Sequence, residues 1–188
     1  RYENYEDFDS EVLFQLAGRL RLTDTWNARA SIGTGFRAPT PGQQGTVNVS
    51  TRLPDGIPVA TGLFPAGGPV AQALGATGLK PELSNSYTVG VTGSLGELDL
   101  TLDYYRIDID DRTNAISTRS VSTDPTSGSA YANYLALDAA GVAGANTIGG
   151  VFYFTNAFDS RTEGVDFVGT LPLGESTVVS AAVNYTEN

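Results

Sequence analysis

The chain has 188 residues with a formal net charge of −10, no cysteine and no histidine. The missing residues exclude disulfides, thiol and histidine metal sites and Ser-His-Asp catalysis, so we expect no enzymatic step, no metal site and no cofactor. The acidic balance excludes nucleic-acid binding, which requires a basic face. The 22 glycines and 9 tyrosines, with only 17% charged residues, are typical of an all-β protein, including a membrane barrel.

Alternating apolar and polar side chains predict three strands in the first part of the chain. They are expected at residues 2–8, 12–22 and 26–36, with tight turns at Asp9-Ser10 and at residues 23–25. From Trp26 to Ile32 the apolar residues share one face, because successive side chains of a strand point to opposite faces. The third strand ends before Pro39, which has no N–H to donate to a ladder.

A long loop is predicted at residues 40–81, where repeated prolines exclude long regular elements. Within it, residues 70–74 are expected to form a helical turn, and Asp55-Gly56 is the candidate turn of a small hairpin. Loops of this length are uncommon in compact domains and are usually functional or disordered. The loop is therefore a candidate functional segment.

Two further strands are predicted at residues 82–95 and 98–109, with a short turn at residues 95–97 between them. In the second of these, Leu100, Leu102 and Tyr104 face one way and polar residues face the other. The same face becomes charged beyond this point, because Arg106 and Asp108 continue its parity. The apolar stripe is therefore shorter than the strand.

A second long loop is predicted at residues 112–150, and its residues 129–143 have the spacing of a short helix. Residues 151–171 are expected to form one long strand. A short turn at residues 173–175 and a last strand at residues 176–186 follow. Apart from the turn at Ser10, the short turns all fall at one edge of the predicted sheet and the long loops at the other.

The predicted fold is therefore all-β: an antiparallel meander sheet of about seven long strands. Alternation alone fits either a soluble sheet or a transmembrane β-barrel, whose apolar face meets lipid. Three features favour the barrel: stripes of roughly 9–11 residues, unequal connections, and aromatics near the stripe ends. These aromatics are Trp26 at one end and Tyr87, Tyr104 and Tyr185 at the other. On pattern alone, a soluble or surface-displayed adhesion module stays open.

Four motifs, in order along the chain, resemble those of the TonB-dependent outer-membrane receptors. They are GTGFRAPT at residues 33–40, LKPELS at residues 79–84 with Tyr87 and Gly90, DYYRIDIDDR at residues 103–112, and FTNA with RTEGVD within residues 154–166. The residues that carry the resemblance, and for which we expect structural roles, are Gly35, Phe36, Arg37, Pro39, Pro81, Glu82, Tyr105, Asn156 and Gly164.

The resemblance implies a barrel of about 22 strands with a plug in its lumen. Such a receptor lies in the outer membrane of a Gram-negative bacterium and imports a scarce, bulky nutrient, such as an iron–siderophore, cobalamin, haem or a carbohydrate. Its implied partners are outer-membrane lipid, the small-molecule nutrient and, through a region N-terminal to this chain, the TonB complex. We expect residues 1–188 to be a partial barrel domain from the C-terminal half, without the plug.

Carboxylates on the strands suggest two kinds of chemistry. Asp108, Asp110 and Asp111 offer oxygen ligands for Ca²⁺, but the glycine and distal glutamate of such a loop are missing, so a solvated strand end is favoured. Carboxylates on the polar faces have the chemistry of glycosidase acids. Ion pairs explain them better, because charges away from water need partners. The candidates for such pairs are Asp99, Asp103 and Asp166 with Arg19, Arg21 and Arg29.

Contacts with cargo are expected in the two long loops and on the upper lumen-facing side of the strands. Aromatic and arginine side chains dominate recognition at interfaces. The candidate ligand contacts are Arg37, Phe64, Tyr105, Tyr131 and Tyr134. A passive porin is the remaining alternative, and it would lack a plug and a TonB-contacting segment.

Overall fold

The computed structural model describes residues 1–5, 10–53 and 58–188, which form two compact units. The first unit consists of Arg1–Arg37, Leu83–Asp110 and Asp159–Asn188. The second consists of two inserts between strands of the first unit, here called the first insert (Ala38–Glu82) and the second insert (Asp111–Phe158).

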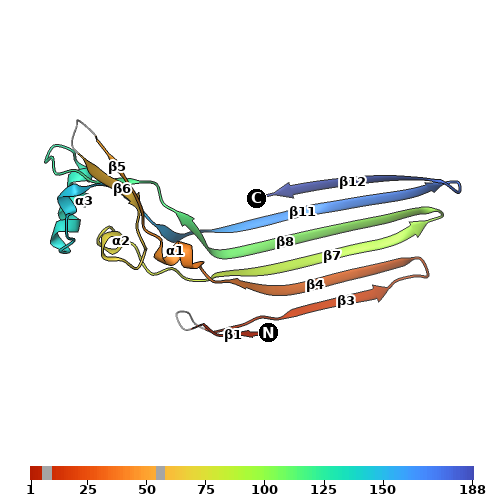
Figure 1. The fold of residues 1–188 in the computed structure, drawn as a ribbon. Coiled ribbons are helices and arrows are strands. Elements are labelled where there is room, and N and C mark those ends of the chain that lie inside the picture. Colours follow the sequence, from red (N-terminus) through yellow and green to blue (C-terminus); the bar gives the residue numbers. More distant parts are fainter. Residues whose placement is uncertain (6–9, 54–57) are drawn as a thin grey trace. The chain divides into compact units, whose positions relative to one another are not determined.

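The first unit is built on an antiparallel sheet of six strands in the order β12-β11-β8-β7-β4-β3. Each strand lies beside the strand that precedes or follows it in this sheet, so the predicted meander is confirmed (Figure 1). The strands are β3 (Gln15–Arg21), β4 (Trp26–Arg37), β7 (Glu82–Leu95), β8 (Leu98–Ala115), β11 (Phe154–Leu173) and β12 (Thr177–Glu187).

Short turns join β3 to β4, β7 to β8 and β11 to β12, as predicted. Gly96 and Gly174 take left-handed backbone conformations there, with φ of 65° and 74°, which glycine adopts without steric cost. In the remaining turn the Thr23 hydroxyl accepts a hydrogen bond from the Trp26 amide at 3.0 Å. Because neighbouring strands are antiparallel, both inserts start at the strand ends that lie away from these short turns. The prediction of short turns at one edge of the sheet and long connections at the other is confirmed.

One face of this sheet is apolar and uncovered. Val91 lies opposite Leu102 in the register of β7 and β8, and Phe167 lies opposite Val183 in that of β11 and β12. Leu102 is 46% exposed and Val183 is 62% exposed. Every buried apolar side chain among the described residues belongs to the second unit. Nothing in the part of the chain that the structure describes therefore packs on this apolar stripe.

The N-terminal part differs from the prediction of a long first strand at residues 2–8. Among the residues described there, β1 (Tyr2–Glu3) and β2 (Glu11–Val12) are short strands that pair with each other, outside the six-stranded sheet. The prediction of one strand at residues 12–22 is wrong at its start, because β2 and β3 are separate strands. Residues 6–9, which include part of the turn predicted at Asp9-Ser10, lie outside the described residues.

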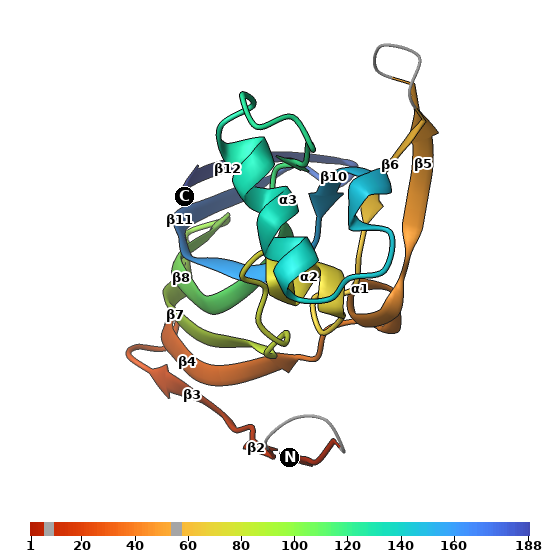
Figure 2. The ribbon, with the colours of Figure 1, turned by 90° about the vertical axis from the view of Figure 1, so that its left-hand side faces the viewer.

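The second unit contains regular structure of its own. A four-stranded sheet has the order β5-β6-β10-β9, and β6 and β10 run parallel. The strands are β5 (Asn48–Arg52), β6 (Val59–Leu63), β9 (Arg119–Ser120) and β10 (Ile148–Phe152). The helices are α1 (Pro41–Gly45), α2 (Pro69–Ala73), α3 (Ser129–Ala139) and the 3₁₀ helix η2 (Ala145–Thr147), and α2 contacts α3 (Figure 2).

The elements of the second unit close around one apolar core. Leu137 of α3 and Val151 of β10 are fully buried, and they share the core with Ala71 and Leu74 of the first insert. Burial of this kind stabilises by roughly 25 cal/mol per Å² of apolar surface. The predicted helices at residues 70–74 and 129–143 are confirmed, with α3 ending earlier, at Ala139. The turn predicted at Asp55-Gly56 lies outside the described residues, between the antiparallel strands β5 and β6.

The prediction of one long strand at residues 151–171 is wrong. The extended segment is interrupted at Tyr153, which separates β10 from β11. Tyr153 is only 3% exposed, and its hydroxyl donates to the Leu74 carbonyl at 3.1 Å. Beside it, the Phe64 amide donates to the Phe152 carbonyl at 3.0 Å. These contacts with the first insert draw β10 into the second sheet, so the ladder of β11 begins only at Phe154.

Candidate functional site

An ion pair spans the polar face of the six-stranded sheet. Arg29 donates two hydrogen bonds to Asp103, with Nε to Oδ1 at 2.8 Å, and neighbouring Ser31 and Thr88 share a hydrogen bond of 2.6 Å. Gly90 lies opposite Asp103 in the register, where a side chain would collide with the carboxylate. The predicted pairing of polar-face carboxylates with arginines is confirmed for this pair. The other two carboxylates have neutral partners instead: Asp99 accepts from Ser94, and Asp166 accepts from Asn184.

Tyr105 lies on the same polar face, where its ring covers Gly164. The hydroxyl shares a hydrogen bond of 2.7 Å with Thr186, and a Cβ at Gly164 would lie 2.6 Å from that hydroxyl. A shallow hollow of about 410 Å³ is lined by Arg29, Thr88, Asp103, Tyr105 and Asp166, among others. Its hydroxyl, carboxylate and guanidinium groups suit hydrogen bonding to a hydrated or polar ligand.

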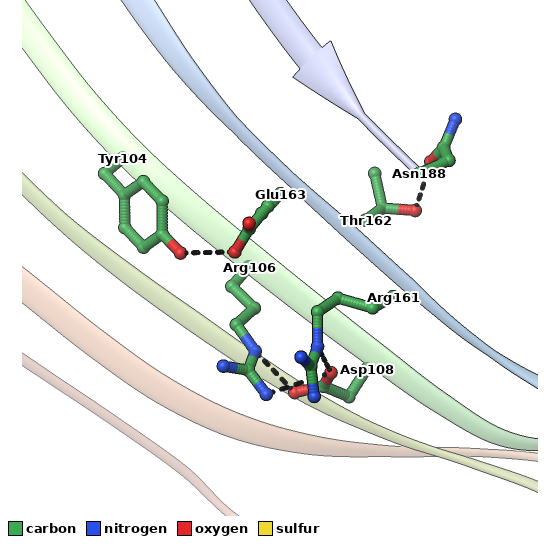
Figure 3. Close-up of polar contacts among 7 residues, drawn as sticks. All are labelled: Tyr104, Arg106, Asp108, Arg161, Thr162, Glu163 and Asn188. Carbon is green, nitrogen blue, oxygen red and sulfur yellow. Dashed lines mark hydrogen bonds and ion pairs between the residues drawn. The ribbon is translucent and has the colours of Figure 1, made fainter.

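A second polar cluster lies on the opposite face of the sheet, the one with the apolar stripe, at the point where that stripe ends on β8 (Figure 3). Asp108 accepts hydrogen bonds from Nε of both Arg106, at 2.8 Å, and Arg161, at 2.7 Å. Next to them, the Tyr104 hydroxyl donates to Glu163 at 2.8 Å. Asp108 was a candidate Ca²⁺ ligand in the sequence. In the structure its carboxylate is paired with Arg106 of its own strand β8 and with Arg161 of the neighbouring strand β11.

Family-motif residues meet at the bases of the two inserts. The Asn156 carboxamide accepts a hydrogen bond from the Lys80 amide at 2.8 Å and donates to the carbonyls of Lys80 at 2.9 Å and Asp111 at 2.6 Å. The Glu82 carboxylate, 9% exposed, accepts from the Thr113 amide at 3.0 Å. Between Lys80 and Glu82 lies Pro81 of the same motif.

The remaining motif residues shape the end of β4. A Cβ at Gly35 would collide with the Ser84 hydroxyl. Phe36 stacks on Tyr5 with ring centroids 5.3 Å apart, and Arg37 is the last, exposed residue of the strand. Pro39 is buried, and its carbonyl accepts from the Gln44 side chain at 2.8 Å.

The structure distributes the candidate ligand contacts over both units. Tyr131 and Tyr134 lie together on α3, with ring centroids 6.0 Å apart and planes inclined by 31°. Phe64 and Tyr134 both pack against the core of the second unit. Arg37 and Tyr105 belong to strands of the first unit instead. The second unit thus brings two of the five candidates, Phe64 and Tyr134, to one core.

Sequence reasoning missed the partners of Asp108, the Tyr104–Glu163 contact and the bond between Glu82 and Thr113. The alternation of side chains was the signal that could have found the first two. Arg161 and Glu163 lie on the same face of β11 as Val165 and Phe167, which is the face of the apolar stripe. Glu82 and Thr113 lie just past the last paired residues of β7 and β8, Leu83 and Asp110, where the positive φ of Asp111 interrupts the strand, and no periodicity marks their bond.

None of the described helices is both long and apolar enough to cross a membrane. Within residues 1–5, 10–53 and 58–188, no group of three or more His, Cys, Asp or Glu side chains could hold a metal ion.

Comparison with known proteins gives one family and several solved structures. The model of the family described as TonB dependent receptor-like, beta-barrel, matches residues 1–188. The siderophore receptor PirA from Pseudomonas aeruginosa is 18% identical, with a TM-score of 0.65, over 99% of this chain and 30% of that protein. A variant of the ferric enterobactin receptor PfeA from the same organism is also 18% identical, with a TM-score of 0.64, over 98% and 23%.

The copper transporter OprC is 14% identical, with a TM-score of 0.54, over 96% of this chain and 21% of that protein. The chain thus spans less than a third of the length of these solved structures, and identities this low show a shared fold alone. A comparison with curated protein sequences gives no match.

Proposed function

Because the chain belongs to the TonB-dependent receptor β-barrel family, we propose that it forms part of a receptor that imports a scarce, bulky nutrient across the outer membrane. This family consists of outer-membrane transporters and receptors of Gram-negative bacteria, not of enzymes. Energy would be relayed by the TonB complex, and no enzymatic step is proposed. The chain would supply barrel strands and two external inserts.

The uncovered apolar stripe of the six-stranded sheet is the observation that carries this proposal. Leu16, Val89 and Val179 are more than half exposed on it, at 70%, 54% and 51%. The alternate residues on the other face form polar contacts such as Arg29–Asp103. A sheet with an apolar outside and a polar inside has the pattern of a transmembrane barrel, in which lipid covers the stripe.

The second unit is the proposed recognition element for the nutrient. Tyr131 and Tyr134 present adjacent rings, and rigid aromatic side chains give large contact areas at low entropic cost. We keep the nutrient at the level of the class: an iron–siderophore, cobalamin, haem or a carbohydrate. PirA and PfeA are named for siderophores and OprC for copper, so related barrels serve different cargo.

An uptake assay with the full receptor tests this function. Cells that make or lack the receptor, each with and without TonB, are given radiolabelled ferric siderophores, cobalamin, haem or a maltooligosaccharide as separate probes. We expect uptake of one probe that requires both the receptor and TonB. Receptor-dependent uptake that continues without TonB would indicate a passive porin and contradict the proposal, as would the absence of receptor-dependent uptake of every probe.

A further inference from the structure

The two inserts of the second unit are joined at their bases by one side chain. Asn156, in the second insert, hydrogen-bonds both the amide and the carbonyl of Lys80, in the first. The same carboxamide donates to the Asp111 carbonyl at 2.6 Å. A single amide group therefore connects the end of the first insert with both ends of the second.

Asp111 has an unusual backbone conformation at this junction. Its φ is 57°, the only positive value outside glycine among the described residues. Non-glycine residues pay a steric cost in the left-handed region, and such residues persist where the surroundings hold them. The bond from Asn156 to the Asp111 carbonyl is a direct restraint of this kind.

A carboxylate provides a second link next to the first. Glu82 ends the first insert, is nearly buried, and accepts a hydrogen bond from the Thr113 amide of the second. Thr113 is two residues beyond Asp111, so the conformation of Asp111 sets the direction in which the Thr113 N–H points. Asn156 therefore supports the bond between Glu82 and Thr113 without being one of its partners.

We propose that Asn156 is a conformational lock: it holds Asp111 in the left-handed region and thereby keeps the bases of the two inserts together as one body. When the carboxamide bonds are broken, Asp111 relaxes to an ordinary backbone conformation, and the Thr113 amide leaves Glu82. A displacement at the base of one insert then no longer reaches the base of the other through these hydrogen bonds. This role requires no particular cargo and stands apart from the proposed uptake.

Hydrogen exchange of the full receptor without ligand tests the lock through amides whose own acceptors are unchanged. Asn156→Ala is expected to raise exchange of the Thr113 amide at least tenfold, although its acceptor Glu82 is retained. The reciprocal variant Glu82→Ala is expected to raise exchange of the Lys80 amide, although Asn156 is retained. In the double variant Asn156→Ala with Asp111→Gly, part of the protection of Thr113 should return, because glycine adopts a positive φ without a steric cost.

Asn133→Ala is the matched control. Its carboxamide also donates to a backbone carbonyl of the second unit, that of Ser120 at 2.8 Å, and this bond involves neither base. This control should leave the Lys80 and Thr113 amides protected. Amides at Leu137 and Val151 report whether each variant keeps its core, and the Glu82→Ala arm decides the question if Asn156→Ala does not fold. Unchanged exchange at Thr113 in folded Asn156→Ala, or at Lys80 in Glu82→Ala, would overturn the proposal.

Discussion

Glycines on the six-stranded sheet lie opposite large side chains of neighbouring strands. A Cβ at Gly93 would enter the ring of Trp26 on the apolar face, and one at Gly164 would meet Tyr105 on the polar face. Glycine in a strand interior often marks such a close approach. Each of these glycines therefore leaves room for an aromatic ring of a neighbouring strand.

Gly164→Ala should destabilise the receptor by about 1–3 kcal/mol, because the added methyl group overpacks the contact with Tyr105 and the backbone of Tyr185. Gly18→Ala is the control, since nothing lies within 4 Å of a Cβ at that position of β3. Thermal unfolding in detergent compares the two variants. Equal effects of both substitutions would show that the ring of Tyr105 does not depend on Gly164.

Asp124 gives the second unit a predicted dependence on pH. Its carboxylate accepts hydrogen bonds from the Thr126 amide at 2.9 Å and the Thr126 hydroxyl at 2.8 Å, and these bonds lower its pKa. A carboxylate whose pKa is lowered in the folded state stabilises the fold at pH values above its unfolded pKa of about 3.9. This contribution is lost as the pH falls through the pKa of the folded state.

The difference in stability between the wild type and Asp124→Asn should therefore be largest above about pH 4 and shrink below it. Chemical unfolding of the full receptor across this range measures the difference. Asp138→Asn, on α3, is a control because it removes a carboxylate of the same unit that takes no part in the bonds to Thr126. A difference that is constant across the whole range would contradict the argument.

At the scale of elements, α3 is attached to the second unit by its buried face. Leu137 is fully buried, whereas Leu135 on the same helix is 46% exposed. Leu137→Ala should cost about 2–5 kcal/mol in the stability of this unit, and Leu135→Ala should change it by no more than about 0.5 kcal/mol. Hydrogen exchange of β10 amides measures both, and similar effects would show that Leu137 does not anchor the helix.

At the scale of the whole molecule, the two faces of the sheet should meet different solvents. Spin labels on single cysteines at Leu100 and Leu102 are expected to be relaxed by oxygen dissolved in lipid, whereas labels at Thr101 and Asp103 should be relaxed by a polar nickel complex. The measurement uses the full receptor in lipid vesicles, with no other cysteine. Loss of this alternation, or a polar environment at Leu102, would argue against lipid on the apolar stripe.

By itself the sequence determined the strand parity, the short turns, the two-edged arrangement of connections and the family. These features depend on residues that are close in sequence: alternate side chains, turn glycines and compact motifs. Residues 82–95 were predicted with the bounds that β7 has, because its alternation is uninterrupted and both ends carry turn or loop signals.

The structure of the long connections depends on contacts between segments that lie far apart in the sequence. The parallel pairing of β6 with β10, the bond from the Tyr153 hydroxyl to Leu74 and the bonds between Asn156 and Lys80 all join residues 76 or more positions apart. Contacts at such separations leave no periodicity in the sequence, because they depend on which segments share a core. For the same reason, the sequence could not predict which of the five candidate ligand residues lie close together. The structure shows that Phe64 and Tyr134 pack against one core.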